Sequence, residues 1–172
     1  LSGYQALYND SRLSKPEFLS IADFSQSANI KRLYVIDMIN CKVLFHTYVA
    51  HGRNSGDEYA CSFGNKAESY KSSLGFYLTG NTYQGAHGLS LRLKGCEAGI
   101  NDHAEARGIV IHGADYVSDQ FIRKNGRLGR SHGCPAVPEN LCRPIVNSIK
   151  DGSVLFIFYP DTNYFKQSVF CD

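Results

Sequence analysis

The sequence predicts a mainly β fold, a β-sandwich or barrel of one domain with a few peripheral helices. The chain has 172 residues, and a typical domain has about 100–200, so we expect a single domain spanning 1–172. Short runs of β-branched and aromatic residues follow one another closely, and most are not joined by helical segments. Strands in this arrangement are typical of antiparallel sandwiches and barrels.

Composition and charge exclude several classes of protein. The chain is 43% hydrophobic and 20% charged, which is typical of a globular protein and not of a disordered one. A net charge of +2 gives no electrostatic indication of nucleic-acid binding. No run approaches about 18 consecutive apolar residues, so no membrane span is expected. The six cysteines include no Cys-x-x-Cys pair, which disfavours zinc fingers and thioredoxin-type redox sites.

The N-terminal residues 1–30 are predicted to form a helical extension that precedes a core over about 31–160. Apolar residues recur at helical spacing near the start: Leu1, Tyr4, Leu7 and Tyr8. Ser14 and Glu17 have the spacing of a capping box. We therefore expect a second short helix that contributes apolar contacts from 18–24.

The core is predicted to consist of short strands separated by two long loops. Strands are expected at 33–38, 43–49, 74–79, 88–93, 108–112 and 153–159. The stretches 52–72 and 113–130 are rich in Gly and polar residues and are predicted as loops, which at this length are often functional. Helical periodicity over 141–149 predicts a helix, which Pro144 is expected to split or to begin anew.

Two segments carry residues suited to nucleophilic catalysis. The strand 108–112 ends on His112, and the segment 130–135 contains His132 and Cys134. A nucleophilic cysteine needs a base that favours its thiolate. His132 lies two residues from Cys134, about 6.5 Å away in an extended chain, which is long for a hydrogen bond. We therefore predict His112 as the base and His132 as a supporting residue.

These residues resemble the signature of the L,D-transpeptidase (YkuD) catalytic domain. The matching motif is His112-Gly113 followed by Ser131-His132-Gly133-Cys134. Further segments resemble the divergent murein L,D-transpeptidase branch of this family: 33–37, 50–56, 73–77, 112–116 and 126–130. The similarity extends from about 31 to 159 and implies a β-sandwich with an active-site cysteine. The stretch between the first histidine and Ser131 is longer here than in the usual pattern.

The resemblance also implies a reaction and a role for each motif residue. Cys134 would attack the bond between an L-centre and D-Ala in a peptidoglycan stem peptide, forming a thioester and releasing D-Ala. The amine of a second stem, or water, would resolve the thioester. His112 would act as the base, and the Gly113 carbonyl would orient its imidazole. The expected oxyanion donors and supporting residues are the amides of Gly133 and Cys134, with Ser131 and His132.

Four further residues are predicted to contact the substrate. Arg130 and Arg127 lie just before the predicted nucleophile. Arginine binds carboxylates such as those of stem peptides in bidentate fashion, and we take Arg130 as the first candidate and Arg127 as the second. Tyr83 and His87 precede the strand 88–93 and are expected to line the cleft. The same arginines could instead form a solvated loop, so this interpretation stays open.

Several alternative functions are weighed against the transpeptidase. An L,D-carboxypeptidase, with water as acceptor, and an inactive wall-binding module stay open. A sortase-like enzyme would have an arginine shortly after the cysteine on a strand, whereas Arg143 lies in a predicted helix. A papain-like peptidase has its cysteine before its histidine, the reverse of the order here. A zinc site of His112, His132 and Cys134 would need a fourth ligand.

The predicted chemistry sets expectations for cofactors, partners, location and cysteine pairing. Exchange of one amide for another through a thioester requires no cofactor and no metal. The expected partners are peptidoglycan stem peptides, and the chain is expected to be a monomer in the periplasm or at a bacterial cell surface. Cys134 should stay reduced, which leaves five cysteines and at most two disulfides among Cys41, Cys61, Cys96, Cys142 and Cys171.

Overall fold

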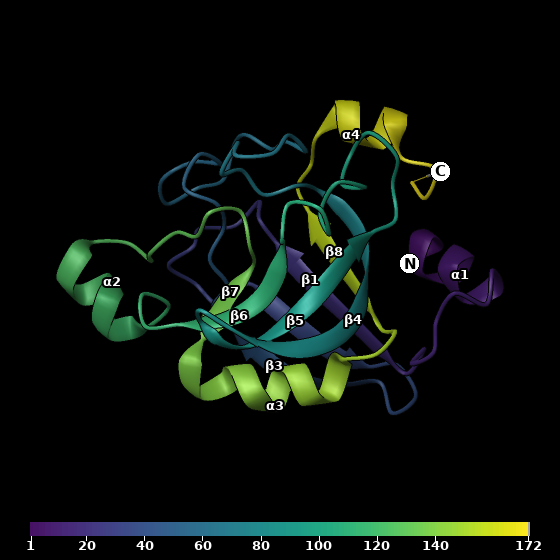
Figure 1. Ribbon diagram of the computed structural model, residues 1–172, viewed down its shortest axis with the longest axis horizontal. Helices are drawn as coiled ribbons and strands as arrows, with labels where there is room; N and C mark the ends of the chain where they lie inside the picture. The colour runs from purple at the N-terminus through teal and green to yellow at the C-terminus, as the bar shows by residue number, and fades with distance from the viewer. Residues whose placement is uncertain (172) are drawn as a thin grey trace.

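A computed structural model describes residues 1–171, in which eight strands form one sheet that curls into a nearly closed barrel (Figure 1). The strands are β1 (Phe18–Asp23), β2 (Leu33–Asp37), β3 (Lys42–Thr47), β4 (Gly75–Gly85), β5 (Gly88–Gly95), β6 (Val110–Ala114), β7 (Ala136–Pro138) and β8 (Val154–Phe158). The helices are α1 (Ser2–Asn9), α2 (Asp119–Asn125), α3 (Glu139–Ile149) and α4 (Thr162–Gln167). The mainly β fold with peripheral helices is therefore confirmed.

The sheet is mixed, which corrects the expectation of an antiparallel arrangement. Its strand order is β3-β2-β1-β8-β4-β5-β6-β7. The pairs β1–β8 and β6–β7 are parallel, and the other pairs are antiparallel. The two edge strands of the sheet are β3 and β7. The chain that follows β3 reaches β7, where the Ala50 amide donates to the Ala136 carbonyl at 2.8 Å. This bridge brings the chain after β3 beside β7 and nearly closes the barrel.

Strand β1 corrects the helix expected over 18–24. Its residues pair with β2 on one side and with β8 on the other, so the strand lies in the middle of the sheet. The Met38 amide donates to the Glu17 carbonyl at 2.8 Å, which extends this pairing past Phe18. Backbone pairing on both sides, together with burial of Leu19 and Ala22, outweighs the capping-box signal. The N-terminal extension is therefore helical only in α1, and the sheet begins before residue 31.

Helix α2 lies within the stretch that was predicted as a loop. The Ser118 hydroxyl accepts a hydrogen bond from the Phe121 amide and caps its first turn, and Gly126 closes it with a left-handed φ of 78°. None of its residues is fully buried. A helix without a buried face has no apolar periodicity, which is why the sequence pattern did not indicate it.

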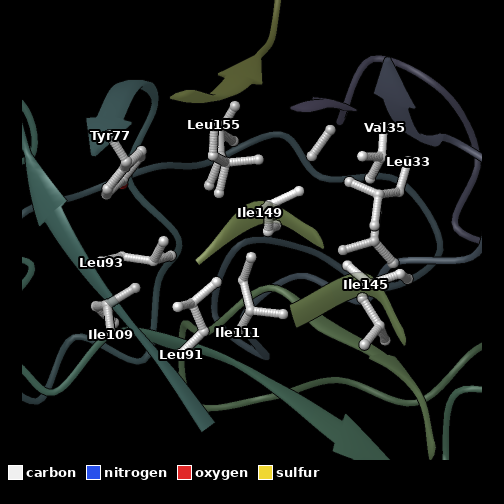
Figure 2. Packing of buried hydrophobic residues seen from close by; sticks show 14 of the residues in the cluster. Leu33, Val35, Tyr77, Leu91, Leu93, Ile109, Ile111, Ile145, Ile149 and Leu155 are labelled. Atoms are coloured by element: carbon white, nitrogen blue, oxygen red, sulfur yellow. The ribbon is translucent and has the colours of Figure 1, made fainter. Parts of the chain in front are cut away.

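Helix α3 runs continuously through Pro144, so the expected split does not occur. Its buried face carries Ile145 and Ile149, which pack against side chains of several strands. Figure 2 shows Ile149 in the middle of this cluster, with Leu33 and Val35 of β2 to one side. Removing such a side chain costs about 2–5 kcal/mol. The helix thus packs against β6, the strand that carries His112.

Candidate active site

A cavity of about 300 Å³ opens beside strands β4, β5 and β6 of the barrel. Three parts of the chain form it: the β4–β5 hairpin, strand β6 with the residues on either side of it, and the turn before β7. The residues that line it are Tyr83, Ala86, His87, Ser90, Gly108, Val110, His112, Tyr116, Arg130, Ser131, His132 and Cys134. The predicted nucleophile and base, from segments far apart in sequence, therefore face the same cavity.

Cys134 lies half-buried on the turn that precedes β7. Its thiol contacts the Gly108 carbonyl at an Sγ–O distance of 3.7 Å. Burial raises the pKa of this thiol, and three groups oppose that rise by favouring the thiolate: the Val110 amide, the Arg107 guanidinium and the Cys134 amide. The described hydrogen bonds of Cys134 do not include one to His112, so the two groups share the cavity without a direct bond.

His112 is 3% exposed and sits on β6, opposite Ser90 of β5 and Ala136 of β7. Its Nδ1 lies 2.9 Å from the Gly113 carbonyl, as predicted. A carbonyl only accepts, so Nδ1 carries the proton and Nε2 of the neutral ring is an acceptor. Burial lowers the pKa of His112, and the charge of His87 lowers it further, while the bond to Gly113 opposes this. The lowered pKa favours the neutral imidazole, which is the form that a general base requires.

Ser131 and Gly133 shape the turn that carries Cys134. The Ser131 hydroxyl donates to the Cys134 carbonyl at 2.6 Å and accepts from the Gly133 amide at 3.0 Å. The Ser72 hydroxyl donates to the Gly133 carbonyl at 3.0 Å. The Gly133 amide, expected as an oxyanion donor, is therefore already engaged. The Cys134 amide is directed toward the Cys134 sulfur. Of the two expected donors, it is therefore the one better placed to donate to an oxyanion.

Gly133 adopts a φ of 123°, a region that L side chains rarely occupy. A Cβ atom here would lie 2.8 Å from the Lys71 carbonyl oxygen and 3.4 Å from Arg107 Nη2. The backbone of the loop 52–72 thus packs directly against the catalytic turn. Only glycine allows both the dihedral angle and this close approach.

Arg107 is a site residue that the sequence reasoning missed. Its Nη1 donates to the Gly64 carbonyl at 3.0 Å and to the Ser73 hydroxyl at 2.7 Å. Its Nη2 donates to the Lys71 carbonyl at 2.6 Å and to the Ser69 hydroxyl at 3.3 Å. Its position just before the strand of His112 was visible in the sequence, but no motif distinguished it from a surface arginine.

The two predicted substrate-binding arginines have different positions. Arg130 lines the cavity, and its Nη1 donates to Asp57 Oδ1 at 2.8 Å and to the carbonyls of Arg53 and Gly56. Arg127 lies outside the residues that line the cavity, with its Nε 3.9 Å from the same Asp57 oxygen. Both guanidinium groups therefore contact a carboxylate of the protein itself.

The other predicted residues surround Cys134 and His112. His87, at the tip of the β4–β5 hairpin, stacks on His112 with ring centroids 4.4 Å apart. Tyr83 also lines the cavity, beneath the Arg92 guanidinium at 4.4 Å from its ring. His132 packs on Tyr70 of the long loop with ring centroids 4.7 Å apart, which fits a supporting role.

Four further features bear on the alternative interpretations. A larger cavity of about 580 Å³, which includes Lys31, Tyr48 and Glu139 in its lining, contains no cysteine among its lining residues. The described part of the chain contains no cluster of three or more His, Cys, Asp or Glu side chains arranged to hold a metal ion. All six cysteines, Cys134 among them, are free thiols. Each helix in residues 1–171 is too short or too polar to span a lipid bilayer.

The solved structures that resemble this fold include L,D-transpeptidases and a cell-shape protein. An L,D-transpeptidase from Mycobacterium smegmatis has a TM-score of 0.52 and 13% identity, covering 83% of this chain and 59% of that chain. The L,D-transpeptidase LdtMt1, solved with imipenem, has a TM-score of 0.51 and 13% identity over the same shares. The helical cell shape determining protein Pgp2 from Campylobacter jejuni has a TM-score of 0.53 and 16% identity, covering 84% and 48%. At these identities the likeness shows a shared fold.

The chain thus spans 48–59% of the length of these solved proteins. No curated protein sequence matches it. The sequence profile of the L,D-transpeptidase catalytic domain matches residues 1–158, which is most of the chain and includes every residue that lines the cavity. The chain therefore belongs to the L,D-transpeptidase catalytic domain family.

Proposed function

We propose that the protein is a cysteine-dependent peptidoglycan L,D-transpeptidase. The observation that carries this proposal is the shared cavity of Cys134 and His112, in which the Gly113 carbonyl fixes the imidazole tautomer. A nucleophile, a neutral base and an orienting acceptor are the parts that thiol acyl transfer requires. Membership of the L,D-transpeptidase family supports peptidoglycan stem peptides as the substrate.

The reaction proceeds in two halves. Nε2 of His112 takes the thiol proton, and Cys134 Sγ attacks the carbonyl carbon of the bond that precedes D-Ala. The negative charge on oxygen is stabilised by the Cys134 amide. The C–N bond breaks, the D-Ala amine leaves with the proton from His112, and a thioester remains. An acceptor amine then attacks the thioester, loses its proton to His112 and forms the cross-link as the thiol is regenerated.

An L,D-carboxypeptidase is the second candidate, since water in place of the amine would give hydrolysis by the same residues. The open cavity beside Cys134 supports hydrolysis as much as cross-linking, because water and an acceptor amine would attack the same thioester carbon. Cys134 and His112 both line the cavity, and the His112 imidazole is oriented by the Gly113 carbonyl, which disfavours an inactive wall-binding module. A peptidoglycan substrate supports a location outside the cytoplasmic membrane, in the periplasm or at the cell surface, and we propose a monomer.

Incubation with disaccharide tetrapeptides, followed by mass spectrometry, separates these functions. We expect loss of D-Ala together with cross-linked dimers from the wild type, and neither product from Cys134→Ser. Cys61→Ser is the matched control, because Cys61 is an exposed free thiol outside the cavity. Loss of D-Ala without dimers would assign the carboxypeptidase, and equal products from wild type and Cys134→Ser would refute the cysteine mechanism.

A carbapenem gives an independent test of the nucleophile. Imipenem is the compound in the complex of the structurally similar LdtMt1. We expect a covalent adduct on intact mass and its location on the peptide that contains Cys134. An adduct on any other cysteine, or none at all, would contradict the assignment of Cys134.

A further inference from the structure

The guanidinium of Arg107 is a half-buried charge that the mechanism above does not use. It makes four hydrogen bonds, all to uncharged acceptors of the loop 64–73. Within residues 1–171 no carboxylate lies within ion-pair distance of it. Arginine stays protonated in proteins, so this is a permanent and uncompensated positive charge. A half-buried charge without a carboxylate partner stabilises a negative charge that forms close to it.

The nucleophile is the group in a position to provide that negative charge. Arg107 Nη2 lies 3.4 Å from where a Cβ of Gly133 would be, and Gly133 immediately precedes Cys134. The thiolate of Cys134 favours the charged form of Arg107, and the Arg107 charge favours the thiolate. The coupling is therefore reciprocal. His112, in contrast, is not among the groups that act on the charge of Cys134 in the resting structure.

Resting on the proposed function, we propose that Arg107 is the fixed counter-charge of the Cys134 thiolate, held at the catalytic turn by the loop 64–73. His112 then serves as the proton acceptor and donor, and it need not remain an imidazolium to stabilise the sulfur. Arg107 exchanges no proton and does not touch the substrate. It is a positioning residue that acts through the nucleophile.

The rate at which Cys134 is alkylated by iodoacetamide as a function of pH measures this directly. The thiolate is the reacting form, and alkylation requires no peptidoglycan substrate. Other titratable and charged groups face the same cavity and are unchanged in the variants below: His87, His112, His132, Tyr83, Tyr116 and Arg130. Because the other five cysteines are also free, the product is quantified by mass spectrometry on the peptide that contains Cys134.

We expect Arg107→Gln to alkylate about tenfold more slowly than the wild type at a pH well below the pKa of the thiol, because an adjacent opposite charge lowers a pKa by about one unit or more. Arg107→Lys keeps the charge and should restore most of the rate. Arg123→Met, on the exposed surface of α2, is the control and should alkylate at the wild-type rate. A folded Arg107→Gln with a wild-type pH dependence would overturn the proposal.

A second variant tests the charge without altering Arg107. Ser69 is half-buried and 3.3 Å from Nη2, so Ser69→Asp places a carboxylate beside the guanidinium. We expect slower alkylation of Cys134 in Ser69→Asp and a wild-type rate in Ser69→Asn, which is similar in size but uncharged. Equal rates in the two variants would overturn the proposal even if Arg107→Gln did not fold. Since this test is independent of the acyl-transfer assay, failure of the proposed function would be seen separately.

Discussion

His87 stacks on His112, with the two imidazole centroids 4.4 Å apart and the rings inclined by 21°. His112 is anchored on β6, whereas His87 is in the two-residue turn between Gly85 of β4 and Gly88 of β5. The hairpin thus covers one face of the catalytic base. A positive charge on His87 would repel a proton on His112, which is one of the causes that lower the pKa of His112.

The first prediction concerns the acid limb of the pH profile. The base must be neutral, so activity falls as the pH drops through the pKa of His112. Burial and the charge of His87 lower that pKa, and removing His87 should raise it. We therefore expect the acid limb of kcat/KM to move to higher pH in His87→Phe and His87→Ala.

The two His87 variants differ in what they retain. Phe keeps an aromatic ring on His112 and should preserve kcat at the optimum, whereas Ala removes the packing and should lower kcat as well. Acid limbs that coincide in the wild type and both variants would show that His87 does not act on the base.

The second prediction concerns the substrate carboxylate. Arg130 Nη1 is bound to Asp57, whose side chain is 81% exposed. An exposed ion pair contributes about 0–1 kcal/mol, so a substrate carboxylate can compete with Asp57 for the guanidinium. We expect Arg130→Ala to raise KM for a tetrapeptide, and Asp57→Asn to lower it by removing the competitor.

Steady-state kinetics on the two variants, alongside their melting temperatures, decide this point. If Arg130 only fixes the loop 53–57, both variants would lose thermal stability and neither would change KM in the expected direction. That result would remove Arg130 from the substrate-binding residues.

The third prediction concerns Gly133. Gly133→Ala would place a Cβ 2.8 Å from the Lys71 carbonyl oxygen in a region of φ that costs about 1–3 kcal/mol for other residues. We expect a lower melting temperature and loss of carbapenem acylation. Gly126→Ala is the matched control, because its φ is also positive but its Cβ would meet nothing within 4 Å. It should lose some stability and keep full acylation.

The fourth prediction concerns stability at acid pH. His51 is fully buried, and its Nδ1 accepts from Arg32 Nη2 at 2.8 Å. Burial and the Arg32 charge lower the pKa of His51 from 6.5 to about 4. The unfolded chain binds this proton first, so the stability contributed is present above pH 6.5 and is lost as the pH falls toward 4. The loss amounts to about 3 kcal/mol for such a shift.

Denaturant unfolding at a series of pH values measures this loss. His51→Gln keeps an acceptor for Arg32 and does not titrate, so its stability should fall less between pH 6.5 and pH 4. A variant as acid-sensitive as the wild type would show that another group controls the transition.

The sequence predicted those parts of the fold and site whose signals are local. Apolar and polar residues alternate along β5, and apolar residues are concentrated in β6. The segment around Cys134 carries a recognisable motif. The helix predicted over 18–24 was wrong because β1 is stabilised by pairing with β8, a partner near the other end of the chain. Arg107 was missed for the same physical reason: its four partners lie in a loop that precedes it by more than thirty residues.

The Gly133 amide shows a related limit. The motif predicted it as an oxyanion donor, but the Ser131 hydroxyl already accepts its hydrogen. A motif specifies which groups are present, whereas their availability depends on rotamers that only the folded turn determines.

The parallel pairing of β1 with β8 has a consequence for synthesis of the chain. Leu19 pairs with Val154, and β2 in turn pairs with β1, so the middle of the sheet joins the first strand made to the last. During translation β1 gains its second partner only after β8 has left the ribosome. The turn that carries Cys134 emerges before β8, so it acquires its complete supporting barrel only after β8 has been made.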